Sequence, residues 1–287
     1  MPRRFPIHPG AVYGVAKEMR AAGEDFHPIV LAGASAPSRE LAAALTAGGG
    51  DAQAVRDLSG RELSAYDLEG AGLLVYFVEG TRPEPADEQA LRLADRKGVD
   101  VLCILVTSGL PEPVDVPYVL ATNVVQAPAG RPLPLEQISE LIAERGDERA
   151  YMWAARLPAL RHAVVEQLIR KFSRQNGILG VAIFVPGADL PALTLNQIRM
   201  VFRIAAAYGE QIDRDRVLEI LAVIGAGLGF RAVAREALGF VPGVGWAIKG
   251  GVAYAGTRAL GKAAAAYFDA GGQRRLKDAV GSVRSRS

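Results

Sequence analysis

Short, continuous apolar runs alternate with helix-like segments in the first half of the chain. The apolar runs lie at 28–33, 73–78, 101–106 and 118–121, with a weaker one at 54–55. Helical segments are predicted at 11–22, 38–45, 88–96 and 135–144. Continuous apolar strands between helices are typical of a parallel sheet that helices cover on both faces. The pattern therefore predicts an α/β domain at residues 1–146 with a mostly parallel sheet.

In the second half the apolar period changes to three and four residues, which is the spacing of amphipathic helices. A helical segment is predicted at 148–175, with Pro158 as its expected break. Further helices are predicted from Leu190 to Tyr208 and at 215–238 and 244–268, with a turn at 239–243. These segments predict an all-α helical domain at 147–270, followed by a basic and disordered tail at 271–287.

Composition adds a charge asymmetry to this two-domain picture. The chain has 287 residues and is 50% hydrophobic, so it can bury a sizeable core. Residues 1–150 hold 14 basic and 22 acidic residues, whereas residues 151–287 hold 19 and 9. The net charges of −8 and +10 indicate two units with different partners. One cysteine fits a reducing compartment such as the cytoplasm, and three scattered histidines do not predict a metal site.

The order of elements in residues 1–146 resembles the P-loop GTPase fold. In that fold a phosphate loop, G-x-x-x-x-G-K-[ST], follows the first strand. The corresponding residues 33–40 read G-A-S-A-P-S-R-E, so only Gly33 matches. Ser38 replaces the second glycine and Arg39 the lysine, while Glu40 replaces the magnesium-binding hydroxyl and would repel phosphate. The resemblance therefore implies a degenerate loop.

The other GTPase motifs are also incomplete. A D-x-x-G sequence occurs at 57–60, but short matches of this kind are weak evidence, and turn formation explains the same residues. The guanine-reading N-K-x-D should follow the strand at 101–106, where residues 107–110 read T-S-G-L. The sequence predicts no catalytic residue, no cofactor, and no magnesium-dependent nucleotide affinity tighter than about 100 μM.

A second resemblance covers roughly residues 150–268. Its motifs, in chain order, are P-G-A-D at 186–189, L-N-x-x-R-M at 195–200, a tyrosine–glycine stop at 208–209, V-P-G-V-G at 241–245 and T-R-A-L-G at 257–261. This series resembles the YcjF-like domain, domain of unknown function 697. In that family the domain often follows a GTPase domain, and many members are described as membrane proteins. The resemblance therefore implies a role at or near a membrane.

The segment 217–268 has two alternative interpretations, a buried soluble hairpin or a hairpin that enters or docks on a bilayer. No stretch has the roughly 20 apolar residues of a spanning helix, and Lys249 interrupts the longest one. Glycines such as Gly229 and Gly250 favour close helix packing in either case. Candidate interaction residues are Asn196, Arg199, Arg203, Arg231, Trp246 and Lys249.

These observations predict a non-enzymatic, pseudo-GTPase-like scaffold or regulatory protein of the cytoplasm, acting at or near the cytoplasmic face of a membrane. Its candidate partners are another protein, an anionic membrane surface and a second copy of the chain. Nucleic acid is disfavoured, because the basic tail has no aromatic residues on which bases could stack. The alternatives are a nucleotide-binding enzyme with a non-standard phosphate loop and an integral membrane component.

Overall fold

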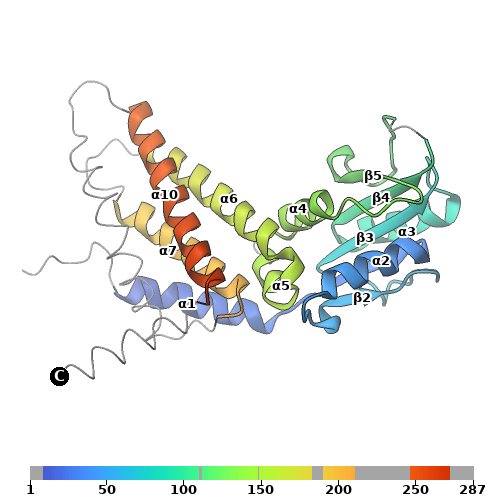
Figure 1. Ribbon diagram of the computed structural model, residues 1–287, viewed down its shortest axis with the longest axis horizontal. Coiled ribbons are helices and arrows are strands. Elements are labelled where there is room, and N and C mark those ends of the chain that lie inside the picture. The colour runs from blue at the N-terminus through green and yellow to red at the C-terminus, as the bar shows by residue number, and fades with distance from the viewer. Residues whose placement is uncertain (1–8, 110–111, 148, 183–189, 211–245, 272–287) are drawn as a thin grey trace, which may run out of the picture. The chain divides into compact units, whose positions relative to one another are not determined.

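The protein divides into two compact units. The computed structural model describes residues 9–109, 112–147, 149–182, 190–210 and 246–271 (Figure 1). One unit comprises residues 23–164, and the other combines residues 1–22 with residues 165–287. We call them the α/β unit and the helical unit. The α/β unit thus ends at residue 164 and not at the predicted 146, and residues 1–22 group with the C-terminal helices.

A five-stranded parallel sheet forms the centre of the α/β unit, as the sequence predicts (Figure 1). Its strands are β1 (Ile29–Gly33), β2 (Val55–Asp57), β3 (Leu73–Glu79), β4 (Val101–Thr107) and β5 (Val124–Pro128). The strand order is β2-β1-β3-β4-β5. Residues of β3 and β4 are buried on both faces of the sheet, which is why these strands read as unbroken apolar runs.

Helices α2 (Ser35–Thr46), α3 (Pro85–Lys97), α4 (Leu135–Gly146) and α5 (Ala150–Arg156) complete this unit, with short 3-10 turns at 52–54, 121–123 and 158–160. The start of α3 follows from its sequence, since Glu84 and Asp87 form a reciprocal capping box. Gly98 ends the same helix with a φ of 65°. Leu91 of α3 and Leu68 of the β2–β3 loop pack on one core with Leu74 of β3.

The strand predicted at 118–121 is wrong, because the last strand begins at Val124. Tyr118 has a φ of 66°, which lies in the left-handed region and is incompatible with an extended strand. Leu120 is 67% exposed, so its apolar side chain does not enter the core. Within this run, Val119 packs partly buried on the core, next to the buried Val116, and both lie in irregular backbone.

The described helices of the helical unit are α1 (Pro9–Glu24), α6 (Arg161–Ala182), α7 (Leu190–Ala207) and α10 (Trp246–Asp269). The α10 helix runs antiparallel to α6: Gly250 lies against Gly177 and Val181, while Gly261 lies against Ile169. A side-chain carbon at Gly261 would lie 2.7 Å from Ile169 and 3.1 Å from Met200 of α7. Glycine therefore lets α10 approach its neighbours closely, as predicted for Gly250. The predicted helix at 215–238, the turn at 239–243 and the tail lie outside the described residues.

Candidate functional site at the carboxyl ends of β1 and β2

The candidate site lies where the strand order reverses. In open α/β sheets, ligands bind outside the carboxyl ends of the strands at this reversal, which here falls between β1 and β3. Only Ala34 separates the end of β1 from the start of α2 at Ser35. Ser38, Arg39 and Glu40, expected within a phosphate-loop-like stretch, therefore belong to the helix. A phosphate loop instead presents the amide groups of several successive non-helical residues.

Gly33 allows the sharp connection between β1 and α2. Its φ is +88°, and a side-chain carbon there would overlap the carbonyl oxygen of Phe77 on β3. The next residue, Ala34, donates its backbone N–H to that same oxygen at 2.9 Å. Both the conformation and the close approach of β3 therefore require glycine at this position.

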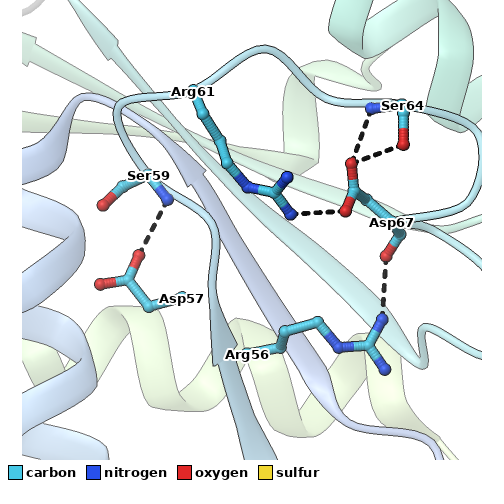
Figure 2. Close-up of polar contacts among 6 residues, drawn as sticks. All are labelled: Arg56, Asp57, Ser59, Arg61, Ser64 and Asp67. Atoms are coloured by element: carbon cyan, nitrogen blue, oxygen red, sulfur yellow. Dashed lines mark hydrogen bonds and ion pairs between the residues drawn. The ribbon is translucent and has the colours of Figure 1, made fainter.

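The D-x-x-G residues close this turn from the β2 side. Ser38 is fully buried, and its hydroxyl donates to Oδ1 of Asp57 at 2.9 Å. The backbone N–H of Ser59 donates to the same oxygen at 3.0 Å, as Figure 2 shows. The N–H of Gly60 donates to the carbonyl of Gly33 at 3.0 Å. We call this set, Gly33, Ser38, Asp57, Ser59 and Gly60, the β1–β2 clamp.

The carboxylate of Asp57 is the centre of the clamp. Partial burial raises its pKa, but hydrogen bonds from Ser59 and Ser38, together with the charge of Arg39, outweigh burial and lower the pKa overall. Asp57 is therefore charged at neutral pH and acts as an acceptor for groups of its own chain. This arrangement fixes the first turns of α2 against the end of β2.

The remaining two residues of the predicted loop also contact their own chain. Arg39 donates through Nε to the carbonyl of Ser35 at 3.2 Å, along the surface of α2. Oε1 of Glu40 accepts the backbone N–H of Leu133 at 2.9 Å, just before α4. No local pattern predicts the Ser38–Asp57 or Glu40–Leu133 contacts, since the partners are 19 and 93 residues apart.

Asp67, which the sequence did not single out, organises the loop at 58–72 between β2 and β3 (Figure 2). Its carboxylate accepts the N–H of Ser64 at 2.9 Å and the hydroxyl of Ser64 at 2.7 Å, and it pairs with Arg61. Arg56 of β2 donates to the carbonyl of Asp67 at 3.0 Å. The hydrogen bonds from Ser64 outweigh burial and, with the Arg61 contact, lower the pKa of Asp67.

The single cysteine is buried within the sheet and is a poor nucleophile. Burial, with a contribution from the nearby charge of Asp87, raises the pKa of Cys103 to about 12. Tyr76, in the same core, donates its hydroxyl to Oδ1 of Asp87 at 2.9 Å. Because the thiolate is the reactive form, Cys103 offers no covalent chemistry at neutral pH.

In the helical unit, Asn196 points into the interior. Its amide donates to Oδ1 of Asn176 on α6 at 2.7 Å. Asn176 donates in turn to the hydroxyl of Thr257 on α10 at 2.8 Å and to the carbonyl of Leu193 at 3.4 Å. Gln197 donates to Thr257 at 3.1 Å. We call Asn176, Asn196, Gln197 and Thr257 the polar seam, because they join three helices through side-chain hydrogen bonds.

The other predicted interaction residues are dispersed. Nη2 of Arg199 lies 3.9 Å from Oε2 of Glu18 on α1, and the Arg199 side chain is 40% exposed. The guanidinium carbon of Arg203 lies 5.5 Å from the ring centre of Phe172. The three candidate residues on α7 therefore differ in their contacts, since Asn196 belongs to the polar seam and the two arginines contact neighbouring helices. Trp246 and Lys249 fall in the first turn of α10, but the positions of their side chains are not described. Arg231 lies outside the described residues.

Within the described parts of the chain, no helix has both the length and the apolar character needed to cross a membrane. Comparison of the sequence with protein-family models gave no match, and comparison with curated proteins gave no significant relative. The GTPase-like and YcjF-like resemblances therefore stay predictions from the sequence.

Proposed function

We propose that the protein is a non-enzymatic scaffold or regulator, in which a GTPase-like α/β unit has exchanged its nucleotide site for internal contacts. The observation that carries the proposal is the β1–β2 clamp. Its two ends, Ser38 and Asp57, come from the positions that resemble a phosphate loop and a D-x-x-G motif, and they hydrogen-bond each other. In a GTPase-like site, the groups at these two positions would face a nucleotide. In this chain they hold α2 against the end of β2.

The local geometry supports the same conclusion. The connection between β1 and α2 has a single intervening residue, and Pro37 removes one amide donor from the first turn of α2. Gly60 closes over this turn, since a side-chain carbon on Gly60 would lie 2.5 Å from Oγ of Ser35. A magnesium–nucleotide complex would have to displace these contacts.

Calorimetric titration of the full chain with magnesium GTP and magnesium ATP tests the proposal. We expect no affinity tighter than about 100 μM, because the β1–α2 connection has one residue, Pro37 lacks an amide donor and Glu40 would repel phosphate. Ser38→Ala, which opens the clamp, should give the same result if the site is no longer a nucleotide site. Micromolar binding by the natural chain, lost in Arg39→Ala, would contradict the proposal.

The location at or near a membrane rests on the sequence, namely the +10 charge of residues 151–287 and the YcjF-like resemblance. A basic surface is attracted to anionic lipid headgroups, and salt weakens that attraction. Fractionation of a cell lysate should therefore find the protein in the membrane fraction and release it with a high-salt wash. Release only by detergent would favour the integral-membrane alternative, and absence from the membrane fraction would contradict this part of the proposal.

A further inference from the structure

Four cations form one face of the α6–α10 pair. Arg170 and Arg174 are four residues apart on α6, and Arg258 and Lys262 are four apart on α10, so each pair lies on one side of its helix. Three of the four are exposed and Arg258 is half-buried. Within the described residues, none of them has a hydrogen bond or ion pair. We call these four residues the basic face.

The contacts of the three helices place both cation pairs on the same side. Gly261 meets Ile169, and Tyr254 meets Gly177, so the two helices align with Arg170 near the level of Arg258 and Lys262. The α7 helix contacts the other side of α6, through Arg203 on Phe172 and Asn196 on Gln175. The basic face is therefore directed away from α7.

Like charges one helical turn apart repel each other, and an anionic partner removes that repulsion. One turn beyond Arg174, the apolar side chain of Ile178 is 67% exposed. Along α6, this surface therefore presents two cations, Arg170 and Arg174, followed one turn later by the exposed apolar Ile178. A partner that fits it should present two anions at the same helical spacing, with an apolar side chain close to them.

The chain itself carries such a helix. Glu136, Glu140 and Glu144 of α4 follow one another at four-residue intervals, and all three are exposed. Their only described ion pair is a contact of 3.6 Å between Glu144 and the neighbouring Arg145. At the start of the same helix, Leu135 is 39% exposed. We call these three glutamates the acidic stripe.

We propose that the basic face of one protomer binds the acidic stripe of a second copy of the chain. With the helices antiparallel, Glu144 meets Arg170 and Glu140 meets Arg174, and the end of α4 that carries Leu135 and Glu136 lies beside Ile178. Because every copy carries both surfaces, two copies of the chain suffice to form this contact. This inference rests on the proposed scaffold function and names its partner. The nucleotide titration tests the scaffold function, and sedimentation tests the dimer, so either one can fail without the other.

Sedimentation velocity on the full chain, between about 1 and 100 μM and at low and high salt, tests the inference. We expect a dimer at low salt that weakens at least about tenfold near 0.5 M salt, because salt screens exposed charges. Arg170→Glu with Arg174→Glu should prevent the dimer, as should Glu140→Lys with Glu144→Lys. The four changes together should restore it to within about threefold, since complementary pairs form again. Arg82→Glu, an exposed reversal on the β3–α3 connection, is the matched control and should leave the dimer intact.

Circular dichroism of each variant separates loss of the dimer from loss of the fold. A natural chain that stays monomeric at about 100 μM and low salt would overturn the inference. So would a dimer that survives both double reversals, or one that the combined reversal does not restore. Vesicles of anionic phospholipid provide the competing arm. A monomer that binds them through Arg170 and Arg174 would assign the basic face to lipid instead.

Discussion

The two units place their polar side chains in opposite parts of the structure. In the α/β unit, the interior strands are apolar, and the hydrogen-bonding side chains lie at strand ends and loops, as with Asp57 and Asp67. In the helical unit, Asn176 and Thr257 are fully buried between helices. Strands are joined by their backbones, whereas each helix satisfies its own backbone internally. Side chains must therefore supply any hydrogen bonds that fix the register between helices.

The comparison predicts that the α/β unit is most sensitive to changes of backbone conformation. Gly33→Ala should cost roughly 3–5 kcal/mol of that unit's unfolding free energy, because it combines an unfavourable φ with overlap on Phe77. Denaturant unfolding followed by tryptophan fluorescence measures this cost. Trp153 lies in the α/β unit and Trp246 in α10, so a Trp246→Phe background reports on the α/β unit alone.

Gly80→Ala is the matched control for this substitution. Gly80 also has a positive φ, of +105°, but a side-chain carbon there meets nothing within 4 Å. Gly80→Ala should therefore cost only about 1–2 kcal/mol of unfolding free energy, which is the part due to the unfavourable φ alone. Equal losses at both glycines would mean that the close approach of β3 to Gly33 contributes little.

For the helical unit, the comparison predicts that a buried side chain is the sensitive element. Asn176→Ala should cost about 2–4 kcal/mol of unfolding free energy, because it removes the 2.7 Å acceptor of Asn196 and the 2.8 Å donor to the buried Thr257. Thermal unfolding by circular dichroism, with the helix signal as readout, measures the loss. Gln175→Ala, which removes only the exposed 3.4 Å contact from Asn196, should change stability by less than about 0.5 kcal/mol. A similar loss of stability in the two variants would show that the polar seam does not stabilise the helical unit.

Acidification should affect the α/β unit through Asp57 and Asp67. Folding lowers the pKa of both groups below the reference value of 3.8, so their contribution to the unfolding free energy is complete above that pH. This contribution is lost as the pH falls through the lower pKa values that the two groups have in the folded state. Denaturant unfolding in the Trp246→Phe background should therefore show stability declining below about pH 4.

Asp67→Asn sharpens this test. It should lower stability at neutral pH by about 1–2 kcal/mol, since Asp67 is buried and accepts from Ser64 and Arg61. It should also flatten the decline in acid, because one titrating group is gone. An unchanged acid profile would assign the decline to other carboxylates.

The sequence predicts those parts of the fold that depend on local pattern. The apolar runs at 28–33, 73–78 and 101–106 became β1, β3 and β4, and the break at Pro158 lies between α5 and α6. The strand predicted at 118–121 is wrong, because Val119 is partly buried in a loop that packs on the core without strand pairing. Apolar character alone does not distinguish those two outcomes.

Of the candidate site, the sequence identified the residues but not their partners. Gly33 and the D-x-x-G segment do meet at one place, and reading them as turn residues agrees with the positive φ of both glycines. That Ser38 faces Asp57, or that Asn196 faces Asn176, depends on how distant segments pack. Polar spacing along α7 could group Asn196 with Arg199 and Arg203, but it could not show which of them a neighbouring helix covers.

The grouping of residues 1–22 with residues 165–287 has a consequence for synthesis of the chain. The α1 helix leaves the ribosome before the α/β unit, with an apolar side made of Val12, Val15 and Met19 that is buried in the finished unit. Its partners follow only after the whole α/β unit. At 5–20 residues per second, that interval is roughly ten to thirty seconds. During it the nascent chain exposes an amphipathic segment, so α1 is the natural point for a chaperone to engage.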